Sequence, residues 1–299
     1  MKSETVERTI GEFASERRRV ISTWRVLILL RRFAHAAHHR LPGWEEAESV
    51  VRSMRRRRWI TRVGQVHWMF RIDAPFARVL PLADEHILLE AHPAAALSHA
   101  SALFHHQMTD TPPRRIHVTD RRFDPARIPP CGTLPEDWVD LDLPINIVRR
   151  LRRVGDLSVD WRRVTDRFSI GYAPFFITGV AVYMSDIEQT LIDGLRSPDR
   201  CGGIGNVFAA WRRAAERINL DRLIGYIDRV DSPILRQRAG YLIEAIGLSH
   251  QALERWQDIK QRGSTLRLLP GEPFDPTYSE RWNLSLNAPS ELLSLLEPL

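Results

Sequence analysis

The spacing of apolar residues in the N-terminal part of the chain predicts two helices followed by a β-hairpin. Apolar side chains recur with a helical period between residues 20 and 33, and arginines occupy positions between them. After a break at residues 41–43, a second helix is expected from Trp44, with glutamates in its first turn and arginines in its last. The period then changes to two on both sides of residues 63–65, which indicates a hairpin. This order of elements is typical of a winged helix-turn-helix.

The short middle helix of such a module is the hardest element to place, and residues 35–40 are the candidate. This segment contains three histidines, His35, His38 and His39, which together resemble a metal-binding cluster. No carboxylate or cysteine stands at ligand spacing near them, so solvated or packed histidines are favoured and no metal site is predicted.

The rest of the chain, past a linker at residues 73–83, mixes helical and strand periods. Residues 120–155 contain five prolines and no periodic pattern, so a long surface connection is expected there. The prediction is an α+β protein, in which a winged helix-turn-helix at residues 1–80, the N-terminal module, precedes a larger mixed α/β domain at residues 84–299. Helices are expected at Asp84–Ala91, from Ser98, and at Asp186–Leu195, Val207–Arg217, Leu220–Val230, Pro233–Ile246 and Ser249–Gln261; strands are expected at Arg115–Thr119, Phe175–Thr178, Val180–Met184, Leu266–Leu269 and Trp282–Asn287.

Charge is unevenly divided between the two predicted domains. Residues 1–80 hold 17 Lys and Arg against 8 Asp and Glu, whereas residues 81–299 hold 26 against 29. A basic module beside a near-neutral body is expected when one domain binds a polyanion such as DNA, the alternative being a solvated charged face. The side chains predicted to contact DNA are Arg52, Arg55, Arg56, Arg62 and Arg71.

Three glutamates, Glu45, Glu46 and Glu48, depart from this pattern because they stand in the first turn of the predicted recognition helix. Carboxylates there repel phosphate. They either turn away from the DNA or accept a hydrogen bond from a cytosine amino group.

Composition excludes several classes of protein. Cys131 and Cys201 are too few for a disulfide framework and match no metal motif. The apolar stretch at residues 26–30 is far too short to cross a bilayer, so a cytoplasmic, soluble protein without cofactor is expected.

Candidate catalytic groups are weak. Asp186, Glu188 and Asp193 form either a carboxylate cluster for metal or acid–base work or a structural helix start; a Ser-x-x-Glu capping box from Ser185 to Glu188 favours the structural role. The glycine-rich residues 201–205 precede a helix as in a phosphate cradle, but they lack the spacing of the known nucleotide-binding motifs.

A nucleophilic or nuclease site is also not indicated. Ser98, His99, Ser101, His105 and Asp110 crowd one helix and its exit instead of converging from separate elements. No Glu-x-Lys motif follows a candidate aspartate. We therefore predict no catalytic residues and a protein that is not an enzyme.

Several motifs resemble one family when their order and spacing are taken together. They are the segments at residues 101–110, 185–195 and 238–244, with Pro198, Gly202, Gly203 and Gly247 between and behind them. Over most of residues 84–287 the chain resembles the AbiEi-type antitoxins of type IV toxin-antitoxin systems. One departure is Gln107, which stands where many relatives carry glycine.

The resemblance implies a function that composition alone does not. The N-terminal winged helix would repress the operon by binding inverted repeats in double-stranded DNA, and the C-terminal domain would counteract a nucleotidyltransferase-like toxin without a stable complex. A stand-alone winged-helix regulator without a toxin is the first alternative, and a nucleic-acid-processing enzyme is the second. An adjacent reading frame for such a toxin would distinguish the antitoxin from the regulator.

Overall fold

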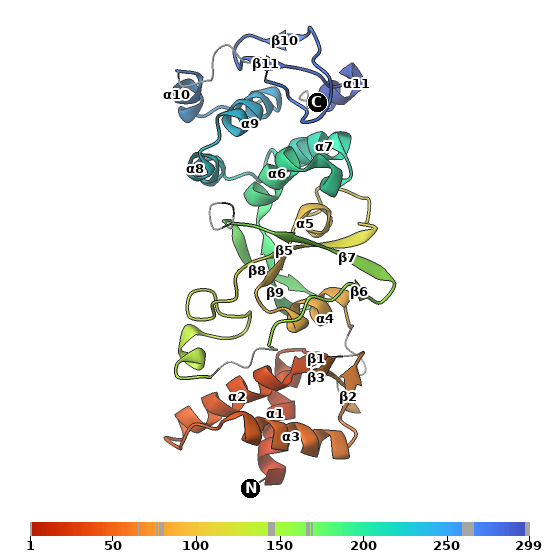
Figure 1. Cartoon of the computed structure of the whole chain (residues 1–299), viewed down its shortest axis with the longest axis vertical. Coiled ribbons are helices and arrows are strands. Elements are labelled where there is room, and N and C mark those ends of the chain that lie inside the picture. Colours follow the sequence, from red (N-terminus) through yellow and green to blue (C-terminus); the bar gives the residue numbers. More distant parts are fainter. Residues whose placement is uncertain are drawn as a thin grey trace. The chain divides into compact units, whose positions relative to one another are not determined.

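The computed structural model of this chain describes residues 2–64, 66–75, 77, 81–142, 147–165, 168, 170–258 and 266–296 (Figure 1). It is a mixed α+β protein, as the sequence predicts. Gln65 of the predicted hairpin, part of the predicted linker and residues 259–261 of the last long predicted helix lie outside the described residues.

The described residues of the N-terminal module form three helices and a small antiparallel sheet of strand order β1-β3-β2. The predicted second helix and the hairpin are confirmed. The elements are α1 (Lys2–Ser15), β1 (Val20–Ser22), α2 (Thr23–Ala36), α3 (Trp44–Arg56), β2 (Ile60–Val63) and β3 (Val66–Ile72).

Helix α1 was not predicted from the sequence, although it contributes to the core of the module. Its apolar residues Val6, Ile10 and Phe13 are buried and are spaced four and three positions apart, so they share one face. They pack in the same cluster as Val51 and Met54 of α3. The segment was not recognised because its other face carries many charged residues, so its overall composition is polar.

Two expectations for the region around α2 are wrong. Residues 20–22 are a strand and not the start of the helix, because Val20 pairs with Arg71 of β3 and Ser22 caps α2 by accepting the N–H of Arg25 at 3.3 Å. The short helix expected at residues 35–40 is absent. His35 lies in the last turn of α2, and His38 has a φ of 53°, a left-handed conformation that ends the helix.

A six-stranded mixed sheet has the strand order β6-β7-β5-β4-β9-β8. Leu97 and Met184 pair β4 with β9 in parallel, whereas β6 and β7 are antiparallel. The predicted strand at residues 115–119 and the predicted pair around Gly179 are confirmed. The strands are β4 (Ala95–Leu97), β5 (Arg115–Asp120), β6 (Arg153–Val154), β7 (Leu157–Arg163), β8 (Tyr172–Ile177) and β9 (Val180–Ser185).

Most of the remaining helices lie close to their predicted positions, whereas the last strands differ from the prediction. Gly247 has a φ of 80° just beyond α9, and the N–H of Leu248 reaches the carbonyl of Ile243 at 2.9 Å, which closes the helix end. The elements are α4 (Asp84–Ala91), α5 (His99–His105), α6 (Ile187–Arg196), α7 (Ile204–Ala214), α8 (Leu220–Val230), α9 (Pro233–Ala245), α10 (Ala252–Asp258), β10 (Tyr278–Ser279), β11 (Leu284–Ser285) and α11 (Ser290–Leu293).

The two closing strands are shorter than predicted. The strand expected at residues 282–287 is reduced to β11, and its antiparallel partner is β10. The strand expected at residues 266–269 is reduced to one isolated bridge, from Arg267 to Ser285.

The helical part of the chain has its core around large aromatic side chains. Trp211, Trp256 and Trp282 are fully buried there. Gly240 on α9 leaves room for Trp282, since a Cβ atom at Gly240 would lie 2.2 Å from that ring. Glu244, one turn later, accepts the indole N–H of Trp282 at 2.7 Å. The motif at residues 238–244 therefore holds Trp282 in place.

The chain divides into two compact units, each made of three segments of the sequence. The first contains residues 1–96, 120–159 and 174–183, and the second contains residues 97–119, 160–173 and 184–299. The first unit thus extends beyond the N-terminal module. The predicted division into residues 1–80 and 84–299 stays a prediction about function.

The proline-rich residues 120–155 have little regular structure, as expected, but part of this segment is buried in the first unit. Trp138, in a short 3-10 helix (Pro135–Trp138), is only 6% exposed, and its ring centroid lies 5.5 Å from that of Trp24. Arg32 of α2 forms an ion pair with Asp137 at 2.5 Å. A surface connection therefore describes only part of this stretch. In the described ranges, no helix is both long and apolar enough to cross a membrane.

Candidate nucleic-acid interface

Helix α3 presents arginines on a solvent-exposed flank next to its buried stripe. Ala47, Val51 and Met54 point into the core. Arg52 and Arg55 are exposed and lie three residues apart, so they are neighbours on the outer face of the helix. The same helical period that buries the apolar residues thus places these two guanidinium groups in solvent.

A groove of about 480 Å³ runs between α3 and the β2–β3 hairpin. Arg52 and Arg55 line it from the helix, and Arg62 lines it from β2. The fold thus brings three side chains from two different elements, spread over ten residues of sequence, to one concave surface. The full lining is Thr23, Trp24, Trp44, Glu48, Val51, Arg52, Arg55, Arg62, His67, Trp68, Phe70 and Ile147.

The other two arginines predicted to contact DNA lie outside this groove. Arg56 is exposed at the last position of α3. Arg71 on β3 is exposed but forms an ion pair with Asp73 at 2.7 Å. Hydrogen bonds from Thr61 and Arg71 lower the pKa of Asp73 even though partial burial acts to raise it, so this carboxylate offsets the charge of Arg71 at neutral pH.

The three glutamates of α3 have different roles. Glu46 reaches back to accept the N–H of Gly43 at 2.9 Å and caps the helix, and these backbone hydrogen bonds lower its pKa. Glu45 is exposed. Glu48 lines the groove and lies 3.5 Å from Arg52, one turn along α3. Helix capping therefore accounts for Glu46, whereas Glu48 stands beside the arginines. Whether these acids turn away from DNA or accept a hydrogen bond from a cytosine amino group stays a prediction.

Sequence reasoning did not assign His67, Trp44 or Trp68 to this surface. His67 is exposed on β3, and the two indoles are half-buried along the groove. Trp44 donates its indole N–H to the carbonyl of Asp142 at 2.8 Å, which fixes the ring. The available signal for His67 was the alternation along β3, since it follows the buried Val66. Aromatic residues such as Trp44 and Trp68 gave no signal, because they are more often part of a core.

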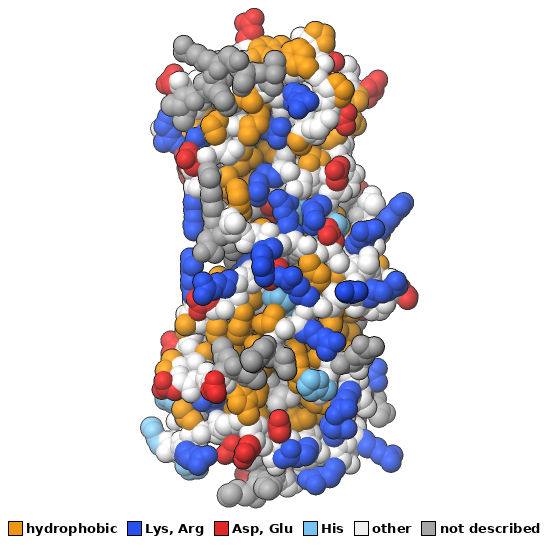
Figure 2. Space-filling view, viewed as in Figure 1, with side chains coloured by type: hydrophobic (Ala, Val, Ile, Leu, Met, Phe, Trp, Pro, Cys, Tyr) orange, Lys and Arg blue, Asp and Glu red, His pale blue; other side chains and the backbone are white. Residues whose placement is uncertain are grey.

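Figure 2 shows blue Lys and Arg side chains gathered on the side of the N-terminal module where α3 ends and β2 begins in Figure 1. Orange hydrophobic side chains lie next to them. Red side chains on this face of the module lie toward the opposite end of α3. This face of the module therefore combines positive charge with apolar surface.

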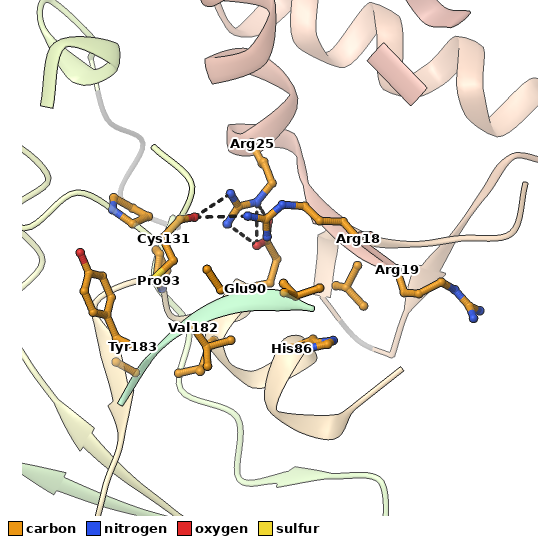
Figure 3. Close-up of a pocket in the computed structure, with 15 residues that line it drawn as sticks. Arg18, Arg19, Arg25, His86, Glu90, Pro93, Cys131, Val182 and Tyr183 are labelled. Carbon is orange, nitrogen blue, oxygen red and sulfur yellow. Dashed lines mark hydrogen bonds and ion pairs between the residues drawn. The ribbon is translucent and has the colours of Figure 1, made fainter. Parts of the chain in front are cut away.

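A second, much smaller cavity of about 30 Å³ lies in the first unit (Figure 3). A buried ion pair between Arg25 and Glu90 forms part of its lining. Arg25 donates from Nε and Nη2 to the carboxylate of Glu90, at 2.7 Å for the shortest contact, and Ser22 donates to the same carboxylate at 2.6 Å. Arg18 and Arg25 both point toward the carbonyl of Cys131, whereas Arg19 points away. These groups satisfy one another, as buried charges must.

The thiol beside this ion pair is not activated. Burial raises the pKa of Cys131 to about 11, although Arg25, Arg121 and Arg18 act in the opposite direction. Because the thiolate is the reactive form, a nucleophilic role is disfavoured at this position.

The carboxylates of α6 are engaged in structural contacts, but not through the predicted capping box. Asp186, and not Ser185, is the cap of α6, since its Oδ1 accepts the N–H of Gln189 at 2.8 Å. Glu188 accepts the N–H of Asn219 at 2.7 Å and pairs with Arg222 at 3.4 Å. The capping box prediction was therefore wrong by one residue.

Asp193 is a buried carboxyl group of α6, as Glu188 is. One of its oxygens accepts the side-chain amide of Gln189 at 2.9 Å. Burial raises the pKa of Asp193 to about 6 despite the nearby Arg196 and Arg162. Among the described residues, no three His, Cys, Asp or Glu side chains form a group that could hold a metal ion.

The Ser and His residues around α5 belong to hydrogen-bonded pairs. His99 Nδ1 lies 2.8 Å from the Oγ of its neighbour Ser98, which also accepts the hydroxyl of Thr119 at 3.0 Å. His106 Nε2 lies 2.7 Å from the carbonyl oxygen of Ser185. Ser101 accepts the backbone N–H of His117 at 2.9 Å.

Comparison with solved structures gives a distant structural likeness. No protein-family model matches this chain, and no curated protein matches its sequence. Among solved structures, the fold is similar to the crystal structure of the RV2827C protein from Mycobacterium tuberculosis. The TM-score is 0.48 at 15% identity, and the alignment covers 98% of this chain and 93% of that chain. A likeness at this level carries no inference about activity.

Proposed function

We propose that this protein is a DNA-binding antitoxin of the AbiEi type. In this proposal the N-terminal module represses its own operon by binding inverted repeats, and residues 84–299 counteract a nucleotidyltransferase-like toxin without forming a stable complex with it. The protein acts by binding and not as an enzyme. The sequence resemblance supports the antitoxin part, and the groove beside α3 supports the DNA-binding part.

The groove is the observation that carries the proposal. Arg52, Arg55 and Arg62 line it together, which extends positive charge from α3 to the β2–β3 hairpin. The element order α1-β1-α2-α3-β2-β3 with its three-stranded antiparallel sheet supports a winged helix-turn-helix. In that arrangement α3 lies in the major groove, and the hairpin contacts the neighbouring phosphates.

The experiment is a titration of a labelled duplex from the region upstream of the gene, alongside a shuffled duplex, at several salt concentrations. Arg55→Ala and Arg62→Ala should weaken binding to both duplexes and lower the salt slope by about 0.9 for each arginine–phosphate pair that the substitution removes. Arg229, an exposed arginine at the end of α8, provides the matched control. Unchanged affinity and salt slope in the triple variant of Arg52, Arg55 and Arg62 would refute the DNA-binding assignment.

The antitoxin part is tested separately from DNA binding. The adjacent reading frame, if it encodes a nucleotidyltransferase-like protein, is expressed from an independent promoter with this chain. The full chain should restore growth, and the triple arginine variant should still do so while losing repression. An orphan regulator, the alternative, would have no such neighbour and would restore nothing.

A further inference from the structure

A polar pocket of about 570 Å³ lies within the second unit, remote in sequence from the N-terminal module. It forms beside β5, β7 and the short 3-10 helix Pro198–Cys201. Its lining is Ala100, Thr111, Pro112, Pro113, Arg114, Arg115, His117, Asp160, Asp199, Arg200, Cys201, Gly202 and Asn206. The volume falls in the range of pockets that hold small molecules.

The strands explain why polar groups gather here. Arg115 and His117 are two positions apart on β5 and so share one face of the sheet, while Ile116 between them is buried on the other. Asp160 stands on β7, the neighbour of β5 in the sheet. Arg200 comes from the 3-10 helix and completes the group.

One carboxylate fixes two of these groups. The Oδ2 atom of Asp160 lies 2.7 Å from Nη1 of Arg200 and 3.1 Å from Nδ1 of His117. Burial lowers the pKa of His117 although Asp160 acts to raise it, so the imidazole is neutral at pH 7. Positive charge in the pocket therefore comes from the arginines.

Two arginines of the pocket have no such partner. Arg114 and Arg115 are exposed, and neither side chain makes a hydrogen bond or ion pair with any other residue in the described part of the chain. Asp160 is already shared between Arg200 and His117, and the remaining carboxylate, Asp199, is exposed. The pocket thus offers two guanidinium groups whose charge is not used inside the protein.

The wall opposite the strands is held in a fixed shape. Asn206 donates its amide to the carbonyl of Cys201 at 2.6 Å and accepts the hydroxyl of Thr109 at 2.8 Å. Between these contacts, Gly202 takes a φ of 82°, and a Cβ atom there would lie 3.2 Å from the Asn206 amide. Because hydrogen bonds already hold this turn, ligand binding does not have to supply the free energy for ordering it.

We propose that this pocket binds a small phosphorylated molecule, with the phosphate held by Arg114, Arg115 and Arg200. A phosphate monoester carries close to two negative charges at neutral pH, which matches the two unpartnered guanidinium groups. Guanidinium groups form paired hydrogen bonds with phosphate oxygens, and Arg200 is already oriented by Asp160. The volume that remains accommodates the organic part of the ligand.

Calorimetric titration of the full-length chain in a phosphate-free buffer of constant ionic strength tests the proposal. The probes are inorganic phosphate, adenosine 5′-monophosphate and adenosine. Phosphate and the monophosphate should bind saturably with one site per chain, and adenosine should not bind. Tighter binding of the monophosphate than of phosphate would assign the ligand as an organic phosphate, whereas equal affinities would assign it as phosphate itself.

The variants locate the site. Arg114→Ala and Arg115→Ala change exposed side chains and should each weaken monophosphate binding by about tenfold or more, the usual effect of removing a charge-assisted hydrogen bond. Arg229→Ala, on the exposed end of α8, is the matched control and should bind like the unmodified protein. The triple variant of Arg52, Arg55 and Arg62 should also retain binding, which separates this site from the DNA groove.

Three outcomes would overturn the proposal. One is the absence of saturable binding of phosphate and of the monophosphate. Another is equal loss of binding in Arg115→Ala and Arg229→Ala, which indicates general charge attraction. The last is binding of a short single-stranded oligonucleotide that depends on Arg114 and Arg115 while both small probes fail, because the pocket would then be part of a nucleic-acid surface.

Discussion

Asp186 accepts the backbone N–H of Gln189 at 2.8 Å and so begins helix α6, while its other oxygen accepts the hydroxyl of Tyr226 at 2.8 Å. Burial raises the pKa of Asp186, and the hydrogen bonds from Gln189 and Tyr226 act against that rise. The carboxylate therefore joins the start of one helix to the face of another, α8, within the second unit.

Replacing this cap should be measurable as a loss of stability. Asp186→Ala removes the acceptor of the Gln189 N–H and should lower the free energy of unfolding by about 1–2 kcal/mol. Asp186→Asn keeps an acceptor oxygen and is the matched control, with a smaller loss. Denaturant unfolding of the three proteins checks this. Equal losses in the two variants would show that the charge, and not the cap, is what matters.

Gly240 tests the packing of the motif at residues 238–244. An alanine methyl group there would overlap the ring of Trp282, so Gly240→Ala should destabilise the protein by about 1–3 kcal/mol even though alanine favours helices. Gly225, at which a Cβ atom would meet nothing within 4 Å, is the control on the adjacent helix α8. Gly225→Ala should be neutral or stabilising. A stable Gly240→Ala protein would mean that Trp282 can move aside.

Asp193 should make stability depend on pH. Its pKa is raised by burial to about 6 in the folded chain, above the usual value of about 3.9 expected for the unfolded chain. Folding therefore favours the neutral form of Asp193. Its contribution to the stability of the fold is present below about pH 4 and is lost as the pH rises through 6.

The variant Asp193→Asn keeps a neutral group at all pH values. Its free energy of unfolding should rise relative to that of the unmodified protein between pH 4 and pH 7, by roughly 2–3 kcal/mol at most. Thermal or denaturant unfolding at pH 4.5 and pH 7.5 gives the comparison. Parallel pH profiles for the two proteins would show that Asp193 titrates normally.

The arginines of the N-terminal module should differ in their effects on DNA binding. Arg71→Ala should weaken binding less than Arg62→Ala, because Asp73 already offsets the charge of Arg71. Arg52→Ala, beside Glu48 on the outer face of α3, should cost about 1–3 kcal/mol on the specific duplex only, if it contacts a base. Salt titration of the specific and shuffled duplexes measures all three. A larger effect of Arg71→Ala than of Arg62→Ala would place the DNA on the other side of the hairpin.

Local signals in the sequence predicted much of this fold. Helix α3 and the β2–β3 hairpin follow from a change of period, and the end of α9 follows from Gly247. Elements that depend on distant partners were missed. Strand β1 is one of these, since it has three residues and is defined by its pairing with β3. The cap of α6 was misplaced for a different reason, because Ser185 and Asp186 are both good cap residues.

The candidate DNA groove was only partly predictable, for the same reason. Helical spacing places Arg52 and Arg55 on one face, but the position of Arg62 opposite them depends on how the hairpin packs. The pairing of Arg71 with Asp73 and the orientation of Trp44 by the carbonyl of Asp142 depend on contacts that no spacing rule gives. Residues from the proline-rich segment reach the groove through Ile147, which lies far from α3 in the sequence.

The discontinuous first unit affects how the protein is made. Trp24 emerges from the ribosome well before Trp138, the side chain against which it packs. At a synthesis rate of roughly 5–20 residues per second, the delay is on the order of ten seconds. During that interval the indole of Trp24 lacks its contact with Trp138, and the unit is complete only after residue 183 has been added. A ribosome that stalls within residues 97–183 would therefore hold a nascent chain whose basic module is synthesised but whose first unit is unfinished.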